Sequence, residues 1–438
     1  MLNSPGTNTH AVPVQQTERI VLLDSLRGFA ILGILLMNIP GFSLPGIGFD
    51  PWLLNETGVD YNTWFVVSWF PEGTQRALFS MLFGAGIILF IKGQEKKLGG
   101  LQPADYFFRR QLWLIAFSLF DVYILLWQGD ILLDYACLGM LMFAFRNVSA
   151  KWLLIAAGIC FILMLARENR DLYLEKKMIS KGEAIAKIDT TKMKLDPLQK
   201  ESLEKMKEFK ESSSREGRTK KMEKAMLKSR GSYEDLYTFR TQNYIDDLVD
   251  YLYFRLWDVL LFMFLGMAFF KMGILTGNAP AKVYVWMCII GLGVGLTLSW
   301  FRLQPMIKYN FNWFEYVKNV SFSYYEPSRT FRAIGILGLI MLLYKSGWFK
   351  WMFALLRPVG QMAFTNYLGQ SLLCGILFYG VGFGLYGELQ RHEIYYVVAA
   401  VWVFQIILSN IWMRYFRFGP FEWLWRSLTY WKRQPFKK

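Results

Sequence analysis

The stretch LDSLRGFAILGILLMN, residues 23–38, is apolar enough to lie in lipid, yet it contains Asp24, Arg27 and Asn38. Asp24 and Arg27 are three residues apart, and Asn38 follows Arg27 after eleven residues, which is about three helical turns. The three side chains therefore share one stripe, with Asn38 about 16 Å along the axis from Arg27. Because polar groups in a membrane usually face the protein interior or a water-filled cavity, the stretch predicts a membrane helix with a buried polar stripe. The alternative is that Arg27 only reaches up to the lipid headgroups.

The composition extends this interpretation to the whole chain. Of 438 residues, 54% are hydrophobic, 18% are aromatic and 19% are charged, whereas soluble proteins have about 25% charged residues. The net charge of +15 comes largely from basic residues that flank apolar runs, as in membrane proteins, and no basic patch with interleaved aromatics lies elsewhere. The four cysteines are scattered through apolar stretches and there are two histidines, so no metal site is expected. The sequence predicts a polytopic membrane protein and excludes a nucleic-acid partner.

About ten transmembrane helices fit the apolar runs, since one crossing needs about 20 residues. The fold class expected is an all-α membrane bundle with a polar helical insertion. The second run is too long for one straight helix, and the sequence Pro71-Glu72-Gly73 predicts a kink or break in it. The predicted spans are residues 20–40, 61–91, 106–127, 131–145, 151–165, 248–270, 282–301, 329–344, 360–381 and 393–413.

Basic residues follow the second, fourth, sixth and eighth spans and fill the C-terminal tail. Since basic loops are typically cytoplasmic, both termini are predicted to be cytoplasmic. The polar stretch 167–247 then lies on the other side. Its Lys/Glu pattern with apolar residues every three or four positions predicts amphipathic helices in a hairpin cap; the alternative is a solvated, partly disordered insertion. The predicted parts are a disordered lead, 1–19, a first helix group, 20–166, the insertion, 167–247, a second helix group, 248–415, and a basic tail, 416–438.

The second span contains PEGTQRALFSMLFGAG, residues 71–86. Glu72, Arg76 and Ser80 follow one another at i,i+4 spacing, which places them on one face of a continuous helix. Gly84 and Gly86 would allow close approach of another helix or of a ligand. A ligand site and a purely structural ion pair both fit this pattern.

Carboxylates gather around WQGDILLDYA, residues 127–136. Asp130 and Asp134 share one helical face, although Asp130 also has the position of an N-terminal cap. Asp121 lies one turn before the end of the preceding span. Neighbouring carboxylates can share a proton, which suits acid–base chemistry or proton coupling.

The later spans contain uncharged hydrogen-bonding groups and an arginine pair. The sequence GQMAFTNYLGQS, residues 360–371, places Thr365, Asn366 and Gln370 on adjoining rows of a helix. These side chains suit an oxygen-rich ligand, or they join helices to one another. Arg329 and Arg332 could hold a phosphate or carboxylate.

Five ordered motifs carry a family resemblance: LDSLRGFAILGILLMN, RALFSMLFGAG, WQGDILLDYA, GQMAFTNYLGQS and RFGPFEWLWRSLTY. Together they resemble the YeiB-like family, also called DUF418, of bacterial inner-membrane proteins. The first motif also resembles the transmembrane acyltransferases, which include the acyltransferase-3 and heparan-α-glucosaminide N-acetyltransferase families. Arg27 matches an arginine of acyltransferase-3 proteins, and Asn38 stands where those proteins have a catalytic histidine.

The resemblance implies a membrane acyltransferase, or an acyl-CoA-binding protein, that modifies envelope glycans in the bacterial inner membrane. Acyl-CoA, such as acetyl-CoA, would be the donor. On this hypothesis Arg27 binds the donor, Asn38 contacts the acyl carbonyl, and Asp121 or Asp134 is the base. The expected partners are the lipid bilayer, a small-molecule or glycan acceptor and a second copy of the chain in a homodimer. The alternatives are a transporter of a small polar or anionic molecule and a non-catalytic scaffold or sensor. The further candidates for the binding site are Asp24, Glu72, Arg76, Ser80, Arg329, Arg332, Thr365, Asn366 and Gln370.

Overall fold

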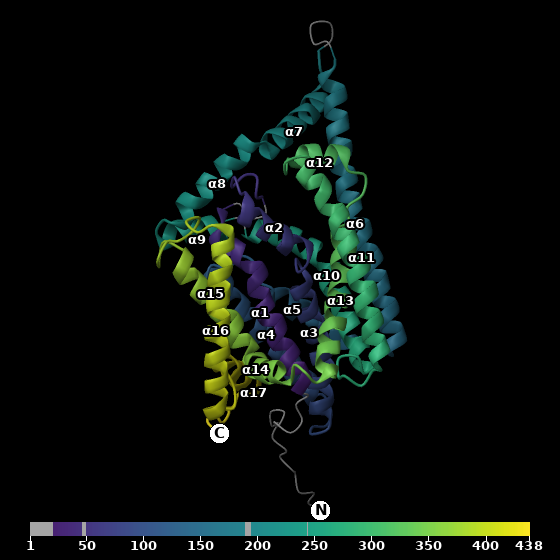
Figure 1. Cartoon of the computed structure of the whole chain (residues 1–438), viewed down its shortest axis with the longest axis vertical. Helices are drawn as coiled ribbons and strands as arrows, with labels where there is room; N and C mark the ends of the chain where they lie inside the picture. The colour runs from purple at the N-terminus through teal and green to yellow at the C-terminus, as the bar shows by residue number, and fades with distance from the viewer. Residues whose placement is uncertain (1–20, 46–49, 189–193, 243) are drawn as a thin grey trace, which may run out of the picture.

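A computed structural model of the chain describes residues 21–45, 50–188, 194–242 and 244–438. The predicted lead, 1–19, lies outside these ranges. Within them the regular structure is helical, apart from one isolated bridge between Phe416 and Lys437. The predicted all-α fold is confirmed, and Figure 1 shows its long helices standing side by side.

The helices follow the predicted apolar runs closely. The first group consists of α1 (Val21–Ser43), α2 (Gly58–Trp69), α3 (Thr74–Glu95), α4 (Gln102–Tyr123), α5 (Leu132–Met142) with a 3₁₀ turn (Phe143–Phe145), and α6 (Ala150–Ala186). The second group consists of α10 (Tyr244–Lys271), α11 (Ala281–Lys308), α12 (Trp313–Asn319), α13 (Tyr325–Ser346), α14 (Lys350–Gln361), α15 (Ala363–Phe378), α16 (Arg391–Tyr415) and α17 (Pro420–Tyr430).

Five stretches of the described residues are long and apolar enough to cross a membrane: 21–43, 58–95, 150–186, 281–308 and 391–415. Others among the predicted spans, such as α10 and α13, carry charged side chains that are buried inside the bundle. These charges lower the apolarity of a helix without exposing it to lipid. The chain has the helices of a membrane protein.

The predicted break in the second span is confirmed. Helix α2 ends at Trp69 and α3 begins at Thr74, with Pro71 and Gly73 between them. Gly73 has a φ of 75°, a left-handed conformation that favours glycine. Arg332 of α13 donates to the carbonyl oxygens of Trp69 (2.9 Å) and Phe70 (3.0 Å), so the backbone groups freed by the break are bonded.

Glycines bring the helices of the core into direct backbone contact. A Cβ on Gly360 of α14 would lie 1.7 Å from the carbonyl oxygen of Asp24 in α1. A Cβ on Gly84 of α3 would lie 2.3 Å from the carbonyl oxygen of Met263 in α10. Small residues permit such approach in membrane bundles, and here they place α14 directly against α1 and α10 directly against α3.

The described residues of the insertion are largely helical. Helix α6 continues past residue 166 to Ala186 because no proline interrupts it, and α7 (Pro197–Ser213), α8 (Arg215–Ser229) and α9 (Tyr233–Thr241) follow. The predicted boundary at 247 likewise falls inside α10. Figure 1 shows α7 and α8 reaching from the top of α6 across the bundle to α9. The insertion contacts the second helix group through its backbone, since the amide of Gly380 donates to the carbonyl of Ser229 at the end of α8 (2.9 Å).

The bundle has two distinct ends. Helix α1 begins, and the chain finishes, at the lower end in Figure 1, which we call the terminal end. The insertion covers the opposite end, which we call the insertion end. The tail, 416–438, is not a free extension: it forms α17, which packs on α4 and α15.

Candidate functional site

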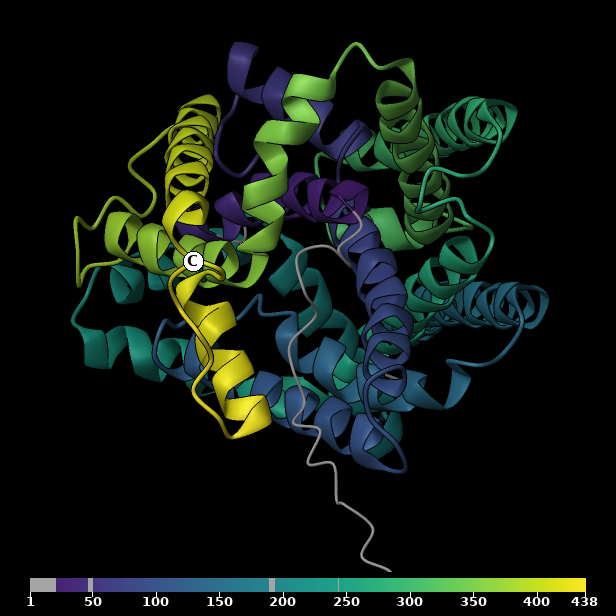
Figure 2. The same ribbon diagram turned by 90° about the horizontal axis from the view of Figure 1, so that it is seen from below.

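A cavity of about 440 Å³ lies within the bundle and reaches toward its terminal end. Side chains of α1, α3, α4, α5, α14, α15 and α17 line it. Figure 2 views the molecule from the terminal end, where α17 (yellow) lies across from α3 (dark blue). The helices from both groups are therefore needed to enclose this space.

The outer part of the cavity is basic. Five basic and two acidic residues line it: Arg27, Lys92, Lys96, Arg110 and Arg426, with Asp24 and Glu422. Lys92 in the last turn of α3 and Lys96, which directly follows α3, are both exposed. Neither they nor Arg110 has a carboxylate partner among the residues that the structure describes. The mouth thus has the charge to attract an anion.

Two of the basic side chains are held in place by their surroundings. The Arg110 guanidinium lies 3.9 Å from the centre of the Trp425 ring, and the Trp425 Nε1 donates to the Arg110 carbonyl (2.9 Å). Arg27 contacts Asp24 at 3.3 Å, and a Cβ on Gly86 would lie 3.3 Å from the Arg27 Nη2. A glycine at position 86 leaves room for this side chain.

The inner part of the cavity is apolar and aromatic. Its walls include Phe79, Phe83, Ile87, Leu114 and Phe364. Gln111 interrupts these walls: it is 2% exposed, and its Oε1 has no hydrogen-bond partner within the described ranges. An acceptor in this setting suits an N–H or O–H group of a ligand.

Two buried tyrosines close the inner end. Tyr135 is 0% exposed, and its hydroxyl lies 2.8 Å from the Ser80 hydroxyl. Tyr367 is 3% exposed and donates to the Asp130 Oδ1 (2.9 Å). Both tyrosines connect the cavity to polar side chains behind it.

Glu422 explains how the C-terminal tail contributes to the site. Its Oε1 accepts the backbone amides of Phe364 (2.7 Å) and Thr365 (3.1 Å), and its Oε2 accepts the Thr365 hydroxyl (2.5 Å). These are free amides at the start of α15, so Glu422 caps that helix from a distance. The cap fixes α17, and with it Trp425 and Arg426, against the cavity.

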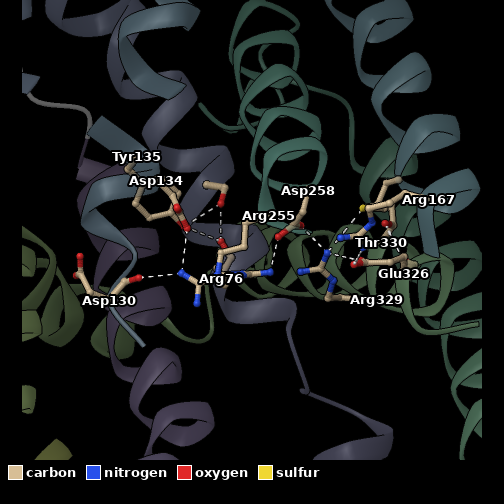
Figure 3. Close-up of polar contacts among 12 residues, drawn as sticks. Arg76, Asp130, Asp134, Tyr135, Arg167, Arg255, Asp258, Glu326, Arg329 and Thr330 are labelled. Carbon is tan, nitrogen blue, oxygen red and sulfur yellow. Dashed lines mark hydrogen bonds and ion pairs between the residues drawn. The ribbon is translucent and has the colours of Figure 1, made fainter. Parts of the chain in front are cut away.

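A buried charge network lies behind the cavity (Figure 3). Asp258 of α10 contacts both Arg76 of α3 and Arg329 of α13. Arg329 also contacts Glu326, which lies 3.7 Å from Arg167 of α6. Four helices of the bundle are thus joined by alternating charges.

The prediction that Glu72, Arg76 and Ser80 share one helical face is wrong for Glu72. Glu72 lies in the turn between α2 and α3, where it pairs with Arg302 of α11. The helix break at Pro71 and Gly73 moves Glu72 off the face that Arg76 and Ser80 share. Arg76 pairs with Asp258 instead.

The structure does not bring the other predicted polar residues together in one site. Asp24 and Arg27 form the expected local pair and line the cavity, whereas Asn38 is half-buried and is not among the lining residues. Asp134 pairs with Arg255 (3.2 Å), and Asp121 is fully buried near the end of α4. The structure therefore separates Asn38 from Asp24 and Arg27.

The polar groups of α13 and α15 hold helices together. Asn366 donates to the Val359 carbonyl and the Ser409 hydroxyl (both 3.1 Å), and Gln370 donates to the Ile31 carbonyl (3.2 Å). Arg329 and Arg332 are 0% exposed, in contact with acidic side chains and with backbone carbonyls respectively. Within the described ranges, no cluster of three or more metal-ligating side chains occurs.

Sequence reasoning missed Arg110, Gln111, Tyr135, Tyr367 and Glu422 as lining residues. Each lies in an otherwise apolar or aromatic segment, where one polar group looks like an interface residue. The available signal for Tyr135, Tyr367 and Glu422 is their presence inside three of the quoted motifs. The sequence predicts Asp130 as an N-terminal cap, and its Oδ2 accepts the amide of Leu132 (3.1 Å) at the start of α5.

The chain is similar to several known proteins. A family model described as "Protein of unknown function (DUF418)" matches residues 269–432. YxaH of Bacillus subtilis (strain 168) is 29% identical over 97% of this chain and 98% of its own length. YeiB of Escherichia coli (strain K12) is 29% identical over 94% of this chain and 96% of its own length. The chain is thus similar to the YeiB-like proteins along nearly its whole length, and its C-terminal part matches the DUF418 family model.

A third relative of this YeiB-like protein is a 39.9 kDa protein from Bacillus acidopullulyticus, 25% identical over 97% of each chain. No solved structure is a significant match. The DUF418 segment contains Gly360, Tyr367 and Glu422 of the cavity, whereas Arg27 and Arg110 precede it. The matched segment alone does not enclose the site.

Proposed function

We propose that this protein is a membrane acyltransferase whose cavity binds an acyl-CoA, such as acetyl-CoA, from the terminal end. The observation that carries the proposal is the order of side chains along the cavity: exposed lysines at the mouth, then arginines, then apolar walls, then two buried tyrosines. An acyl-CoA has the matching order, since anionic phosphates are followed by a pantetheine arm with two amides and then by the thioester.

Each part of the donor has a counterpart in the lining. Arg27, Lys92, Lys96 and Arg110 would bind the phosphates, because arginine and lysine are the usual partners of such groups. Gln111 would accept an amide N–H of the pantetheine arm. A cavity of about 440 Å³ encloses the arm and a short acyl group, while the nucleotide remains at the basic mouth.

The topology fits a donor from the cytoplasm. Basic loops mark the cytoplasmic side, and the terminal end has Lys92, Lys96 and Arg110 near its surface. We therefore place both termini in the cytoplasm of a bacterial inner membrane and the insertion on the opposite side. The acceptor would be a glycan or another envelope molecule. In the transfer, a bond forms between the acceptor oxygen or nitrogen and the thioester carbon, the C–S bond breaks, and the acceptor proton ends on the released thiol.

The first test is binding of acetyl-CoA to the purified protein in lipid nanodiscs, measured by calorimetry. Arg110→Gln should weaken binding about tenfold or more, since a hydrogen bond to a charged group contributes about 1.5–3 kcal/mol. Lys350→Gln is the matched control: Lys350 is exposed at the start of α14, at the same end, but does not line the cavity.

The second test is transfer of a labelled acetyl group from acetyl-CoA to envelope glycans in membranes that contain the protein. We expect transfer that depends on Arg110 and not on Lys350. Monodisperse protein that binds no acetyl-CoA, or equal loss of affinity in both variants, would refute the proposal. Movement of an anionic solute into proteoliposomes without acyl transfer would favour the transporter instead.

A further inference from the structure

Six carboxylates are buried in the part of the chain that the structure describes. Four of them contact an arginine side chain: Asp24, Asp134, Asp258 and Glu326. The other two, Asp121 and Asp130, have no ion-pair partner within the described residues. An ionised carboxylate in an apolar interior needs a cation or several hydrogen-bond donors. The surroundings of these two side chains therefore decide their charge.

Asp130 is surrounded by donors. Its Oδ2 accepts the Ser118 hydroxyl and the Leu132 amide, and its Oδ1 accepts the Tyr367 hydroxyl at 2.9 Å. Arg255 is nearby, but its guanidinium bonds the main-chain oxygen of Asp130 (3.0 Å) and the carboxylate of Asp134. An acceptor-only carboxylate fits this environment, so Asp130 is the ionised member.

Asp121 is in the opposite situation. It is 0% exposed in the last turn of α4, and neither of its carboxyl oxygens has a hydrogen-bond partner among the described residues. The Ser118 hydroxyl, which donates to the Asp130 carboxylate, stands one turn before Asp121 on α4, so the two carboxyl groups face the same place in the bundle. Asp130 and Ser371 are the polar side chains that act on Asp121 among the described residues. A second negative charge beside Asp130 would be costly at low dielectric, so Asp121 is the protonated member of the pair.

Three further ionisable groups among the described residues belong to the surroundings of the pair. Tyr244 of α10 lies near Asp130, and Tyr379, which follows α15, lies near Asp121. The guanidinium of Arg240 in α9 lies over the Tyr379 ring, 5.2 Å from its centre. Arg240 thus contacts the face of the Tyr379 ring, and no ion pair joins it to either aspartate among the described residues.

Tyr367 joins this pair to the cavity. Its side chain lines the cavity, and its hydroxyl donates to Asp130 while accepting the amide of Ile131 (3.2 Å). We propose that Asp121 and Asp130 share one proton and that Tyr367 passes protons between this pair and a molecule bound at the inner end of the cavity. We call this path from the cavity through Tyr367 to the two aspartates the proton relay. Its use in acyl transfer rests on the proposed function, whereas the shared proton does not.

The relay balances the transfer reaction. As the acceptor oxygen or nitrogen bonds to the thioester carbon, its proton moves to the Tyr367 hydroxyl, and the tyrosine proton moves to Asp130. The C–S bond breaks, and the reverse movement returns one proton to the departing sulfur. Tyr367 is the catalytic residue, since it touches the reacting groups, and the aspartates act through it.

Infrared difference spectroscopy on the purified protein at neutral pH tests the shared proton directly. The wild-type spectrum should contain the C=O stretch of a protonated carboxyl group, which Asp121→Asn removes because Asp130 is then ionised alone. Asp130→Asn should keep a protonated Asp121 and move the band to higher frequency. The control is Asp134→Asn, which changes an arginine-paired carboxylate and should leave the band in place.

The link to the cavity is tested in the same spectra. Tyr367→Phe removes a donor to Asp130 and should move the band, whereas Phe364→Leu changes another lining residue and should not. Absence of a protonated carboxyl in the wild type, or its persistence unchanged in Asp121→Asn, would overturn the proposal. A band unmoved by Tyr367→Phe would overturn the relay.

Kinetics separate this inference from the proposed function. Tyr367→Phe should lower the rate of acyl transfer at least tenfold while acetyl-CoA binding stays within twofold. If no acetyl-CoA binds to folded protein, the acyltransferase proposal fails, and the infrared result still decides the aspartate pair. Full transfer activity in Tyr367→Phe would refute the catalytic role of the tyrosine.

Discussion

Replacement of Asp258 by asparagine tests the buried charge network most directly. Asp258 is 2% exposed and joins Arg329, which is 0% exposed, to Arg76. Removal of one partner from a buried ion pair costs about 3–5 kcal/mol, because it leaves an uncompensated charge. Arg329 keeps its contact with Glu326, and the Arg76 side chain is 28% exposed and so partly screened by solvent. We therefore expect the lower end of the range, about 3 kcal/mol.

The assay is unfolding of the purified protein by sodium dodecyl sulfate in mixed micelles, followed by circular dichroism. The control is Asp105→Asn, which removes a helical i,i+4 pair with Arg109 whose side chains are 47% and 38% exposed. That change should cost about 0.5 kcal/mol or less.

A double variant distinguishes loss of an ion pair from general damage. Arg329→Gln alone leaves Asp258 with Arg76, so it should also be costly. The combination with Asp258→Asn should cost at least about 1 kcal/mol less than the sum of the two single changes, because the two residues contact each other. A cost for Asp258→Asn no larger than that for Asp105→Asn, or strict additivity, would refute the reasoning.

Three further substitutions probe the packing, the helix break and the insertion. Gly360→Ala should abolish stable folding or cost about 3 kcal/mol, because its Cβ would lie 1.7 Å from the Asp24 carbonyl oxygen; Gly293→Ala, whose Cβ meets nothing within 4 Å, should be neutral or stabilising by up to about 1 kcal/mol in the same titration. Arg332→Met should leave carbonyls at the α2–α3 break unbonded and speed amide exchange there at least tenfold, measured by mass spectrometry. Ser214→Ala should remove the N-terminal cap of α8 and cost about 1 kcal/mol locally, seen as faster exchange in that helix alone.

The features predicted correctly from sequence depend on neighbours along the chain. Apolar length predicts α1, and the proline and glycine at 71 and 73 predict the break between α2 and α3. The pair of Asp24 and Arg27 follows from i,i+3 geometry. In each case the physical cause lies within a few residues, so the sequence contains it directly.

Partner choice between distant helices could not be predicted in this way. A helical wheel places Arg76 on a face but does not say that Asp258, 182 positions later, lies opposite. Glu72 shows the same limit: its nearest basic neighbour in sequence is Arg76, yet the break turns it toward Arg302. The face of a helix is a local property, whereas the identity of the facing helix depends on the packing of the whole bundle.

The polar residues of α1 meet different neighbours along the helix, and this difference affects the mechanism. Helical spacing predicts that Asp24, Arg27 and Asn38 share a face, but the facing neighbours change along the helix. Asp24 and Arg27 meet the cavity and Gln361, which donates to Asp24 (3.2 Å). Asn38 lies beyond the inner end, and its side chain makes no hydrogen bond with the described residues. An acyl group held in this cavity would meet Tyr367 and not Asn38. Acid–base chemistry at this site therefore requires a group connected to the lining, and Tyr367 with Asp130 provides that connection.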